Sequence, residues 1–444
     1  MNVIIVVGIN WGDEGKGRIV DLLAQNADFV IRYQGGNNAG HTIMNEFGKF
    51  KLHLIPSGIF STGTVNVLGP GTVINLEALS NEMMELKGQG IEISESNFVV
   101  SDRAVICFPF HVLQDEYEEA RLGANAFGST KRGIAPIYAD LASKYAIQTN
   151  ALLKPSFLKA QIERVVDYKN RIFLNVYGRP ALKAEDVLRW ALEYGERVKP
   201  HLRDVVELFA ARQGGGGTAV LEAQLGALRD IVYGIYPFTT SSCTLSHFGS
   251  VGSGLFWRTT PRVIGVMKAF STCVGAGPFV TEILGELADN IRERSDEYGA
   301  ATGRARRIGH FDAVASRYGV RLQTSSALAL TKLDTLSGLK SLKICTQYDI
   351  GGKRTTSFPH YSDLVGAKPA YIDMPGWQED IRSVRRYDDL PAAAKTYVET
   401  IERLVECPIE YISVGPERES IILRGDNARH SAIWQRDHAG KPQL

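Results

Sequence analysis

The N-terminal segment constrains the fold more than any other part of the chain. Residues 2–7 (NVIIVV) form a continuous apolar run rich in β-branched side chains, and a glycine-containing loop follows over residues 8–15. Such a run is typical of a strand buried on both faces, as in a parallel sheet covered by helices. Apolar residues over 19–23 then recur at helical spacing, which predicts a helix directly after the loop.

Similar runs recur along the chain and alternate with helical patterns, which predicts the α/β class. We expect a large central, mostly parallel sheet flanked by helices, with a P-loop-like N-terminal loop. No Pro/Ser-rich linker interrupts the sequence, so we expect one large domain over 1–444 with helical insertions, the main one over roughly residues 100–200. The further strands are expected within 29–36, 65–69, 98–102, 218–222, 327–334, 342–350 and 409–415, and helices within 111–121, 180–196, 202–211 and 391–406.

The composition excludes several classes of protein. The 444 residues carry 50 Lys and Arg against 49 Asp and Glu, and 44% are hydrophobic. A disordered chain needs lower hydrophobicity and higher net charge, and nucleic acid or an anionic membrane needs a positive field that a net charge of +1 does not give. No apolar run approaches the roughly 18 residues of a membrane span, and no signal peptide is evident. Five widely spaced cysteines without a CxxC pair indicate reduced thiols, so we expect a cytoplasmic protein with no nucleic-acid or membrane partner.

The first loop, GINWGDEGKG over residues 8–17, is a candidate phosphate site. It lies between a predicted strand and a predicted helix, where free backbone N–H groups and the helix dipole favour an anion. Lys16 would add a positive charge beside the phosphate. The structural alternative is a tight glycine turn that only caps the helix.

This loop departs from an ordinary P-loop in three ways. Six residues separate Gly8 from Gly15, where a P-loop has four, and Gly17 stands where Ser or Thr would hold Mg²⁺. The two acids Asp13 and Glu14 would repel phosphate. One of them therefore needs another task, such as holding a metal or accepting a proton.

The second loop, QGGNNAGHT over residues 34–42, combines three glycines with polar donors. Such a backbone can approach a ligand closely. A lone histidine is more often structural than catalytic, but His41 follows the second predicted strand and is expected beside the first loop. We therefore favour a functional role for His41.

Two further motifs are rich in groups that recognise anions and bases. In TKLD (331–334), Lys332 can lie along a purine face, and Asp334 can accept from the N1–H and 2-amino group of guanine, which adenine lacks. The segment TGRARR (302–307) carries three arginines within four residues. Arginine forks match carboxylates and phosphates, although such a run can also be a solvated basic surface.

Taken together, these motifs resemble those of one known family. With them the chain resembles the adenylosuccinate synthetase family over roughly residues 1–425. The resemblance implies a GTP- and Mg²⁺-dependent ligase of purine biosynthesis, and a homodimer whose sites are completed across the interface. The ligase would join L-aspartate to C6 of IMP through a 6-phosphoryl intermediate, giving adenylosuccinate, GDP and phosphate. The motifs occur in the order WGDEGKG, QGGNNAGHT, GSTKRGIAP (128–136), YPFTTSS (236–242), VGAGPF (274–279), TGRARR, LTKLD, MPGWQED (374–380) and SVGPER (413–418).

The resemblance also implies a role for individual residues. Asp13 would take the N1 proton of IMP, and His41 would donate to the transferring phosphoryl group. The amine of aspartate would then displace phosphate from C6. The positions implied for GTP are Gly12, Gly15, Lys16, Gly17, Gly40, His41, Thr42, Arg306, Lys332, Asp334, Ser413 and Gly415; for IMP Asp13, Asn38, Thr130, Lys144, Gln224 and Thr240; for aspartate Thr302 and Arg304; and for the metal Asp13 and Gly40.

Departures from the family pattern leave alternatives open. The family usually reads EGAQG where this chain reads EAQLG (222–226), so Leu225 occupies the place of a glutamine that reads the purine, and Gln224 comes one place early. One place reverses a side chain in a strand, unless a bulge restores it. Lys144 stands where the family has an arginine that reaches the IMP phosphate of a neighbouring subunit. Asp13 argues against a phage branch that has serine there and makes 2-aminoadenylosuccinate. The alternatives are the same ligase chemistry on a modified purine-like nucleotide, and a non-catalytic GTP-binding protein.

Overall fold

The computed structural model describes residues 1–212, 216–299 and 303–425. Its centre is a ten-stranded sheet in the order β21-β20-β16-β11-β1-β10-β2-β5-β7-β9. Every pairing in this sheet is parallel except that of β20 with β21. The predicted α/β class with a mostly parallel sheet is therefore confirmed. The strands are β1 (Asn2–Gly8), β2 (Phe29–Arg32), β5 (Val65–Leu68), β7 (Phe98–Ser101), β9 (Leu202–Arg203), β10 (Thr218–Glu222), β11 (Arg262–Lys268), β16 (Ala327–Thr331), β20 (Ile409–Ser413) and β21 (Ile421–Leu423).

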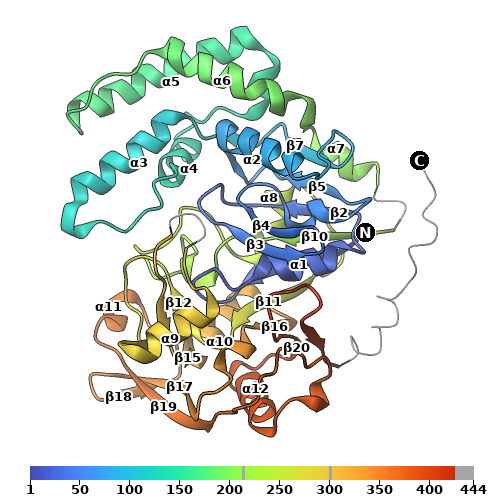
Figure 1. The fold of residues 1–444 in the computed structure, drawn as a ribbon. Coiled ribbons are helices and arrows are strands. Elements are labelled where there is room, and N and C mark those ends of the chain that lie inside the picture. The colour runs from blue at the N-terminus through green and yellow to red at the C-terminus, as the bar shows by residue number, and fades with distance from the viewer. Residues whose placement is uncertain (213–215, 300–302, 426–444) are drawn as a thin grey trace.

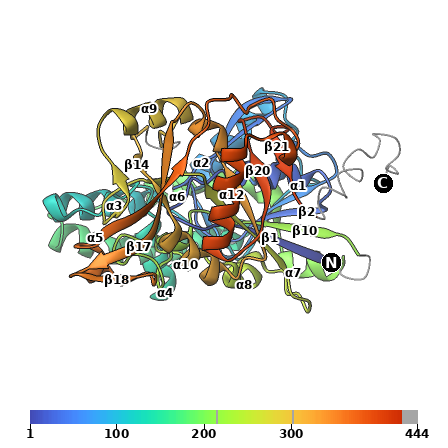
Figure 2. The ribbon, with the colours of Figure 1, turned by 90° about the horizontal axis from the view of Figure 1, so that it is seen from below.

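Helices pack against this sheet, and further helices lie beyond both of its ends (Figure 1). Helices α3 to α6 gather at one end, and α12 lies beside β20 at the other end (Figure 2). The helices are α1 (Lys16–Ala24), α2 (Leu76–Gly88), α3 (Pro109–Leu122), α4 (Ile134–Ala142), α5 (Pro155–Asn175), α6 (Ala184–Val198), α7 (Val205–Ala210), α8 (Gly249–Ser253), α9 (Glu286–Ser295), α10 (Ala313–Gln323), α11 (Tyr361–Leu364) and α12 (Ala392–Val405).

Strand β1 is buried on both faces, as its composition predicts. Val3, Ile5 and Val7 pack into one hydrophobic cluster, which also contains residues of β2, β10 and α7. Val6 points into a second cluster, with apolar residues of α1 on the opposite face. Because alternate side chains of β1 point to opposite faces, α1 packs against one face of the sheet. The first loop, which connects β1 to α1, therefore lies at the end of β1.

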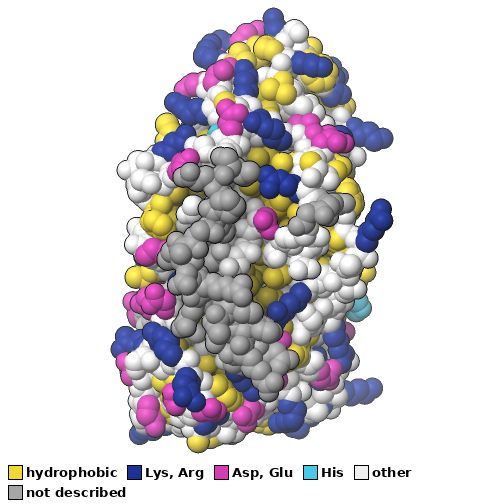
Figure 3. Space-filling model, turned by 90° about the vertical axis from the view of Figure 1, so that its right-hand side faces the viewer, with side chains coloured by type: hydrophobic (Ala, Val, Ile, Leu, Met, Phe, Trp, Pro, Cys, Tyr) yellow, Lys and Arg dark blue, Asp and Glu magenta, His cyan; other side chains and the backbone are white. Residues whose placement is uncertain are grey.

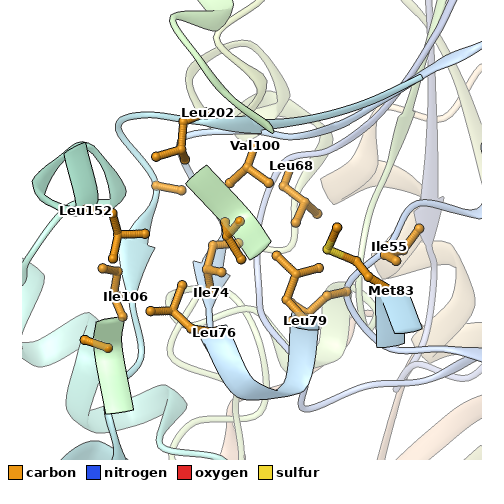
Figure 4. Close-up of a cluster of buried hydrophobic side chains, with 14 of the residues drawn as sticks. Ile55, Leu68, Ile74, Leu76, Leu79, Met83, Val100, Ile106, Leu152 and Leu202 are labelled. Atoms are coloured by element: carbon orange, nitrogen blue, oxygen red, sulfur yellow. The ribbon is translucent and has the colours of Figure 1, made fainter. Parts of the chain in front are cut away.

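The helical segment between β7 and β9 is attached to the edge of the sheet. β7 and β9 pair in parallel, so the chain leaves the sheet after Ser101 and returns at Leu202. A third cluster joins this segment to α2 and the sheet, and Figure 4 shows Leu79 and Met83 near Leu68 and Leu76 near Ile74 and Ile106 within it. This segment contains helices α3 to α6, and its description as an insertion over residues 100–200 stays a prediction. The single-domain organisation itself stays a prediction.

Four smaller sheets complete the described structure. The predicted strand 342–350 belongs to one of them rather than to the central sheet, because β17 pairs with β15 in parallel and with β18 and β19 in antiparallel fashion. These sheets contain β3 (His41–Asn45) with β4 (Gly48–Leu52); β6 (Val73–Ile74) with β8 (Val105–Ile106); β12 (Ser271–Cys273), β13 (Glu282–Ile283) and β14 (Arg307–Gly309); and β15 (Phe311–Asp312), β17 (Ser341–Ile350), β18 (Lys353–Thr355) and β19 (Lys368–Pro375).

The surface carries charges of both signs. On the face in Figure 3, basic and acidic side chains are interspersed. Among the residues that the structure describes, no helix has the length and apolar character needed to cross a membrane.

Candidate active site

The candidate residues converge on the carboxyl edge of the parallel sheet. Ligands of open α/β sheets bind outside this edge, where loops from several strands meet. Both glycine loops, the TKLD motif and the SVGPER motif follow strands that end here. The last residues of the six central strands are Gly8 (β1), Arg32 (β2), Glu222 (β10), Lys268 (β11), Thr331 (β16) and Ser413 (β20).

Glu14 organises the first loop from within. Its Oε1 accepts from the N–H groups of Asn10 at 3.1 Å and Gly12 at 2.8 Å. Its Oε2 accepts from Lys16 Nζ at 2.8 Å, and both side chains are only 2% exposed. Of the two acids in the loop, Glu14 therefore has a structural task, and Asp13 is the one that faces the adjoining cavity.

Gly17 has a steric reason to lack a side chain. A Cβ at this position would lie 2.8 Å from His41 Cβ and 3.1 Å from Ser57 Oγ. Contacts this short force a neighbour to move. The glycine thus allows the second loop to pack against the start of α1, where an ordinary P-loop has Ser or Thr.

His41 is held by a buried carboxylate. Its Nδ1 is hydrogen-bonded to Glu222 Oε1, and the N–H and Oγ of Ser57 donate to the same carboxylate at 2.8 and 2.6 Å. Burial alone would raise the pKa of Glu222, but the charge and hydrogen bond of His41 and the charge of Arg32 lower it to about 2. Burial lowers the pKa of His41, and Glu222 opposes that effect. Because Glu222 holds Nδ1, Nε2 is the ring nitrogen that can serve a substrate.

Asp13 is paired with an arginine of the TGRARR motif. Arg306 Nε lies 3.1 Å from Asp13 Oδ2, and Arg306 also contacts the buried Glu297 through Nη1 at 2.5 Å. The Asp13 side chain is 24% exposed, its residue has a backbone φ of 59°, and it lines the cavity described below. The structure therefore brings the first loop and the arginine loop together, as the sequence predicts for a shared site.

The TKLD and SVGPER motifs lie on adjacent strands. β16 and β20 pair in parallel, so Lys332, Asp334, Ser413 and Gly415 share one end of the carboxyl edge. Arg18 of α1 donates to Ser413 Oγ and to the Gly415 carbonyl. Burial raises the pKa of Asp334, with the charges of Lys332 and Arg18 opposing it. The chain thus places a half-buried carboxylate beside two cations, where it can read a base.

A cavity of about 430 Å³ opens beside Asp13. This volume is typical of small-molecule sites. Acidic side chains of α3 fix part of its wall, because Glu119 accepts from the N–H groups of Phe127, Gly128 and Ser129 at 3.0 to 3.1 Å. The predicted residues that line the cavity are Gly12, Asp13, Asn38, Gly40, Thr130 and Thr240.

Arg229 is the basic side chain that lines this cavity within the described part of the chain. Its Nη1 donates to the Phe238 carbonyl and its Nη2 to the Val274 carbonyl, both at 2.5 Å. The Thr240 N–H donates to the Arg229 carbonyl at 2.9 Å. Arg229 therefore ties together two segments of the cavity wall, including the one that carries Thr240.

The remaining predicted residues lie around these groups. Gly15 caps α1 with a φ of 92° next to Lys16, while Thr42 is exposed in β3. Arg304 Nη1 lies 3.4 Å from the Gly128 carbonyl, at the rim of the cavity. Lys144 is exposed just after α4. Thr302 lies outside the described residues.

The EAQLG segment has an unusual backbone. Leu225 adopts a φ of 57°, a region that bulky residues rarely occupy, and it lines the cavity. The Gln224 side chain is 1% exposed and donates from Nε2 to the Gly36 carbonyl at 2.8 Å. Its Oε1 is buried without a hydrogen-bond partner. Gln224 thus joins β10 to the second loop, and its contact with a base stays a prediction.

Five residues at this edge are not found by motif reasoning: Arg18, Glu222, Arg229, Lys268 and Glu297. Glu222 and Lys268 are charged residues at the ends of apolar strands, and this pattern in the sequence could have identified them. The other three become meaningful only through contacts with other segments of the chain.

Known proteins match this sequence over nearly its whole length. A family model described as adenylosuccinate synthetase matches residues 5–422. The adenylosuccinate synthetase 2 of Pseudoalteromonas translucida is 47% identical over 426 residues, which is 96% of this chain and 100% of the relative. The adenylosuccinate synthetase of a Thermoanaerobacter species is 44% identical over the same shares.

A solved structure of similar fold supports the same relationship. The fully ligated adenylosuccinate synthetase of Plasmodium falciparum has a TM-score of 0.90 and 32% identity, and the match covers 96% of this chain and 100% of that one. The chain belongs to the adenylosuccinate synthetase family and is a ligase of that type.

Proposed function

We propose that the GTP-dependent ligation of L-aspartate to IMP takes place at this carboxyl edge, with IMP in the cavity and GTP along the first loop and the TKLD motif. One observation carries the proposal. The cavity combines a carboxylate, Asp13, with the polar groups Asn38, Thr130 and Thr240, and the ends of β16 and β20 lie on the same edge of the sheet.

Asp13 would activate the nucleotide. The 6-oxygen of hypoxanthine is a poor leaving group, and removal of the N1 proton turns it into a nucleophile. The Asp13 carboxylate faces the cavity and is only partly buried, so it can accept that proton. The 6-oxygen would then attack the γ-phosphate of GTP.

His41 would stabilise the transferring phosphoryl group. Burial favours the neutral ring, so His41 would have to take up a second proton before it donates from Nε2, and the Glu222 carboxylate on Nδ1 favours that step. Fixed donors of this kind lower the barrier where charge develops. Glu222 is then a positioning residue, because it fixes the ring without touching the substrate.

The metal site would use oxygen ligands. Asp13 offers a carboxylate and Gly40 a carbonyl on the wall of the same cavity, and Mg²⁺ prefers such oxygen donors together with phosphate. These residues fit the ion, which would neutralise charge on the phosphates of GTP.

Aspartate would enter from the arginine loop. Arg304 lies at the rim of the cavity, and its guanidinium can bind a carboxylate through two parallel hydrogen bonds. The α-amine of aspartate would then attack C6, and the oxygen of the former carbonyl would leave with the phosphate. Thr302 is proposed to assist from the same loop.

We also propose a homodimer in the cytoplasm. The exposed Lys144 would reach the IMP phosphate of the partner subunit, as the resemblance implies. All five cysteines are free thiols, which agrees with a reducing compartment.

A second candidate is the same chemistry on a purine-like nucleotide whose edge differs from that of IMP. Leu225 lines the cavity, and a leucine side chain cannot hydrogen-bond to a base. Gln224 contacts Gly36 instead. The positions of Leu225 and Gln224 therefore favour, as the alternative to IMP, a nucleotide whose base presents different hydrogen-bonding groups.

A substrate screen tests both candidates. Purified protein is incubated with Mg²⁺, GTP, aspartate and one nucleotide at a time, and products are identified by mass spectrometry. We expect an aspartyl adduct of IMP, with phosphate release only when all three substrates are present. An adduct with another 6-oxopurine nucleotide, and none with IMP, would support the second candidate. Phosphate release without a nucleotide acceptor would contradict both.

A further inference from the structure

Glu297 forms the centre of a buried charge cluster between three segments of the carboxyl edge. Its side chain is fully buried. Lys268 Nζ lies 2.7 Å from its Oε2, Arg306 Nη1 lies 2.5 Å from the same oxygen, and Lys332 Nζ lies 3.7 Å from its Oε1. One carboxylate thus faces three cations, which come from the end of β11, the arginine loop and the TKLD motif.

The cluster depends on the charge of Glu297. Burial alone would raise the pKa of Glu297, but the charges of the surrounding cations lower it to about 2. Burial lowers the pKa of Lys268 to about 8, and Glu297 opposes that effect. Buried charges that lose a partner are costly, so the arrangement of the two buried cations, Lys268 and Arg306, depends on the carboxylate.

Each cation leads to a different part of the proposed site. Arg306 Nε contacts Asp13 Oδ2 at 3.1 Å. Lys268 Nζ donates to Thr272 Oγ1 at 2.8 Å, and Thr272 lines the cavity. Lys332 precedes Asp334 by two residues, at the predicted guanine site.

Glu297 also lies at the base of the arginine loop. The Arg306 N–H donates to the Glu297 carbonyl at 3.0 Å, and Gly299 N–H donates to the Arg304 carbonyl at 2.8 Å. The backbone and the side chain of Glu297 therefore both fix the segment that presents Arg304.

We propose that Glu297 is a positioning residue that joins the aspartate side of the site to its guanine side. By holding Arg306 and Lys332 on one carboxylate, it sets the arginine loop relative to Asp13 and to the TKLD motif. This inference rests on the proposed function, because it assigns aspartate to the arginine loop and GTP to Lys332 and Asp334.

The test compares two isosteric variants. Glu297→Gln removes the charge at nearly constant volume. We expect KM to rise about tenfold for both aspartate and GTP, with a smaller change for IMP, because Arg306 loses a charged hydrogen-bond partner and Lys332 loses the opposite charge 3.7 Å away. The matched control is Glu282→Gln, which breaks a half-exposed ion pair with the neighbouring Arg307. Its KM values should stay within about twofold of wild type, as partly exposed ion pairs contribute little.

A second variant separates positioning from folding. Glu297→Gln leaves two buried cations, Lys268 and Arg306, without their balancing charge, so its Tm should fall. Adding Lys268→Met removes the more buried of them and should recover part of that Tm, while KM for aspartate and GTP stays high. The proposal is overturned if folded Glu297→Gln keeps wild-type KM values, or if the double variant recovers KM together with Tm.

The same variants distinguish this inference from the proposed function. If the wild type does not form the aspartyl adduct, the proposed function fails. In that case calorimetry measures the binding of Mg²⁺-GTP to wild type and to Glu297→Gln. Weaker binding by the variant supports the positioning role of Glu297, and equal binding refutes it.

Discussion

We expect the choice of nucleotide to depend on one carboxylate, Asp334. The Asp334 carboxylate is partly buried beside Lys332 and Arg18, so water competes less for its hydrogen bonds than it would at an exposed position. Guanine offers it two donors, whereas adenine would present the N1 acceptor and leave the buried carboxylate unpaired, which costs about 1–3 kcal/mol or more. We expect GTP to exceed ATP in kcat/KM by a large factor.

The variant Asp334→Asn sharpens this expectation. Its amide can donate to the 2-oxo group of xanthine, so the variant should use xanthosine triphosphate better and GTP worse. Initial rates with the three nucleotides measure this. Equal rates with ATP and GTP in the wild type would show that Asp334 does not read the base.

At the scale of elements, the position of β10 between β1 and β2 sets the contact between two residues of the proposed site. That position brings Glu222, at the end of β10, against His41, which follows β2. The contact predicts a pH effect on stability. Folding lowers the pKa of Glu222 from 4.5 to about 2, so its stabilising contribution is complete above pH 4.5 and is lost as the pH falls toward 2.

Thermal unfolding of Glu222→Gln checks this effect. The variant should have a lower Tm than wild type at neutral pH, and the difference should shrink as the pH falls from 4.5 toward 2. A difference in Tm that is constant with pH would contradict the predicted pairing. Activity should fall in the same variant, because His41 loses the partner of Nδ1.

The sequence predicts local features of the site better than long-range ones. The strand β1, the loop after it and helix α1 follow from a few adjacent residues, and they lie where the pattern indicates. The contact between His41 and Glu222 depends instead on the order of strands in the sheet, which brings together two residues that are 181 positions apart in the sequence. Glu297 likewise gains its meaning only when β11, β16 and the arginine loop meet.

The strand expected within residues 342–350 is present as β17, Ser341–Ile350, but apolar composition did not indicate which sheet it joins. Residues 342–350 have the composition of a strand, but β17 lies outside the central sheet. Its burial alternates over Ser341–Ile344, a pattern typical of an antiparallel strand with one solvated face. Alternation, rather than apolar content alone, is the signal that separates it from β1.

At the scale of the whole molecule, the exposed Lys144 lies on the helical segment between β7 and β9. If its target is the partner's IMP phosphate, inactive variants should complement each other. Lys144→Ala and Asp13→Ala should each be nearly inactive. Mixed and reassembled in equal amounts, they should recover about one quarter of wild-type activity, because half of the dimers then contain one intact site.

Two outcomes would oppose a shared site. A mixture that stays inactive, although the subunits demonstrably exchange, would place Lys144 in its own subunit's site or outside the reaction. Full activity of Lys144→Ala alone would exclude a role for this residue in nucleotide binding.

The fate of the 6-oxygen tests the central claim most directly, because the proposed chemistry moves that atom from the base to phosphate. IMP labelled with ¹⁸O at the 6-oxygen is converted with GTP, Mg²⁺ and aspartate, and the phosphate released is examined by mass spectrometry. We expect each molecule of phosphate released by the wild type to carry the label, and Asp13→Ala to release none. Adenylosuccinate formed together with unlabelled phosphate, or wild-type turnover by Asp13→Ala, would contradict it.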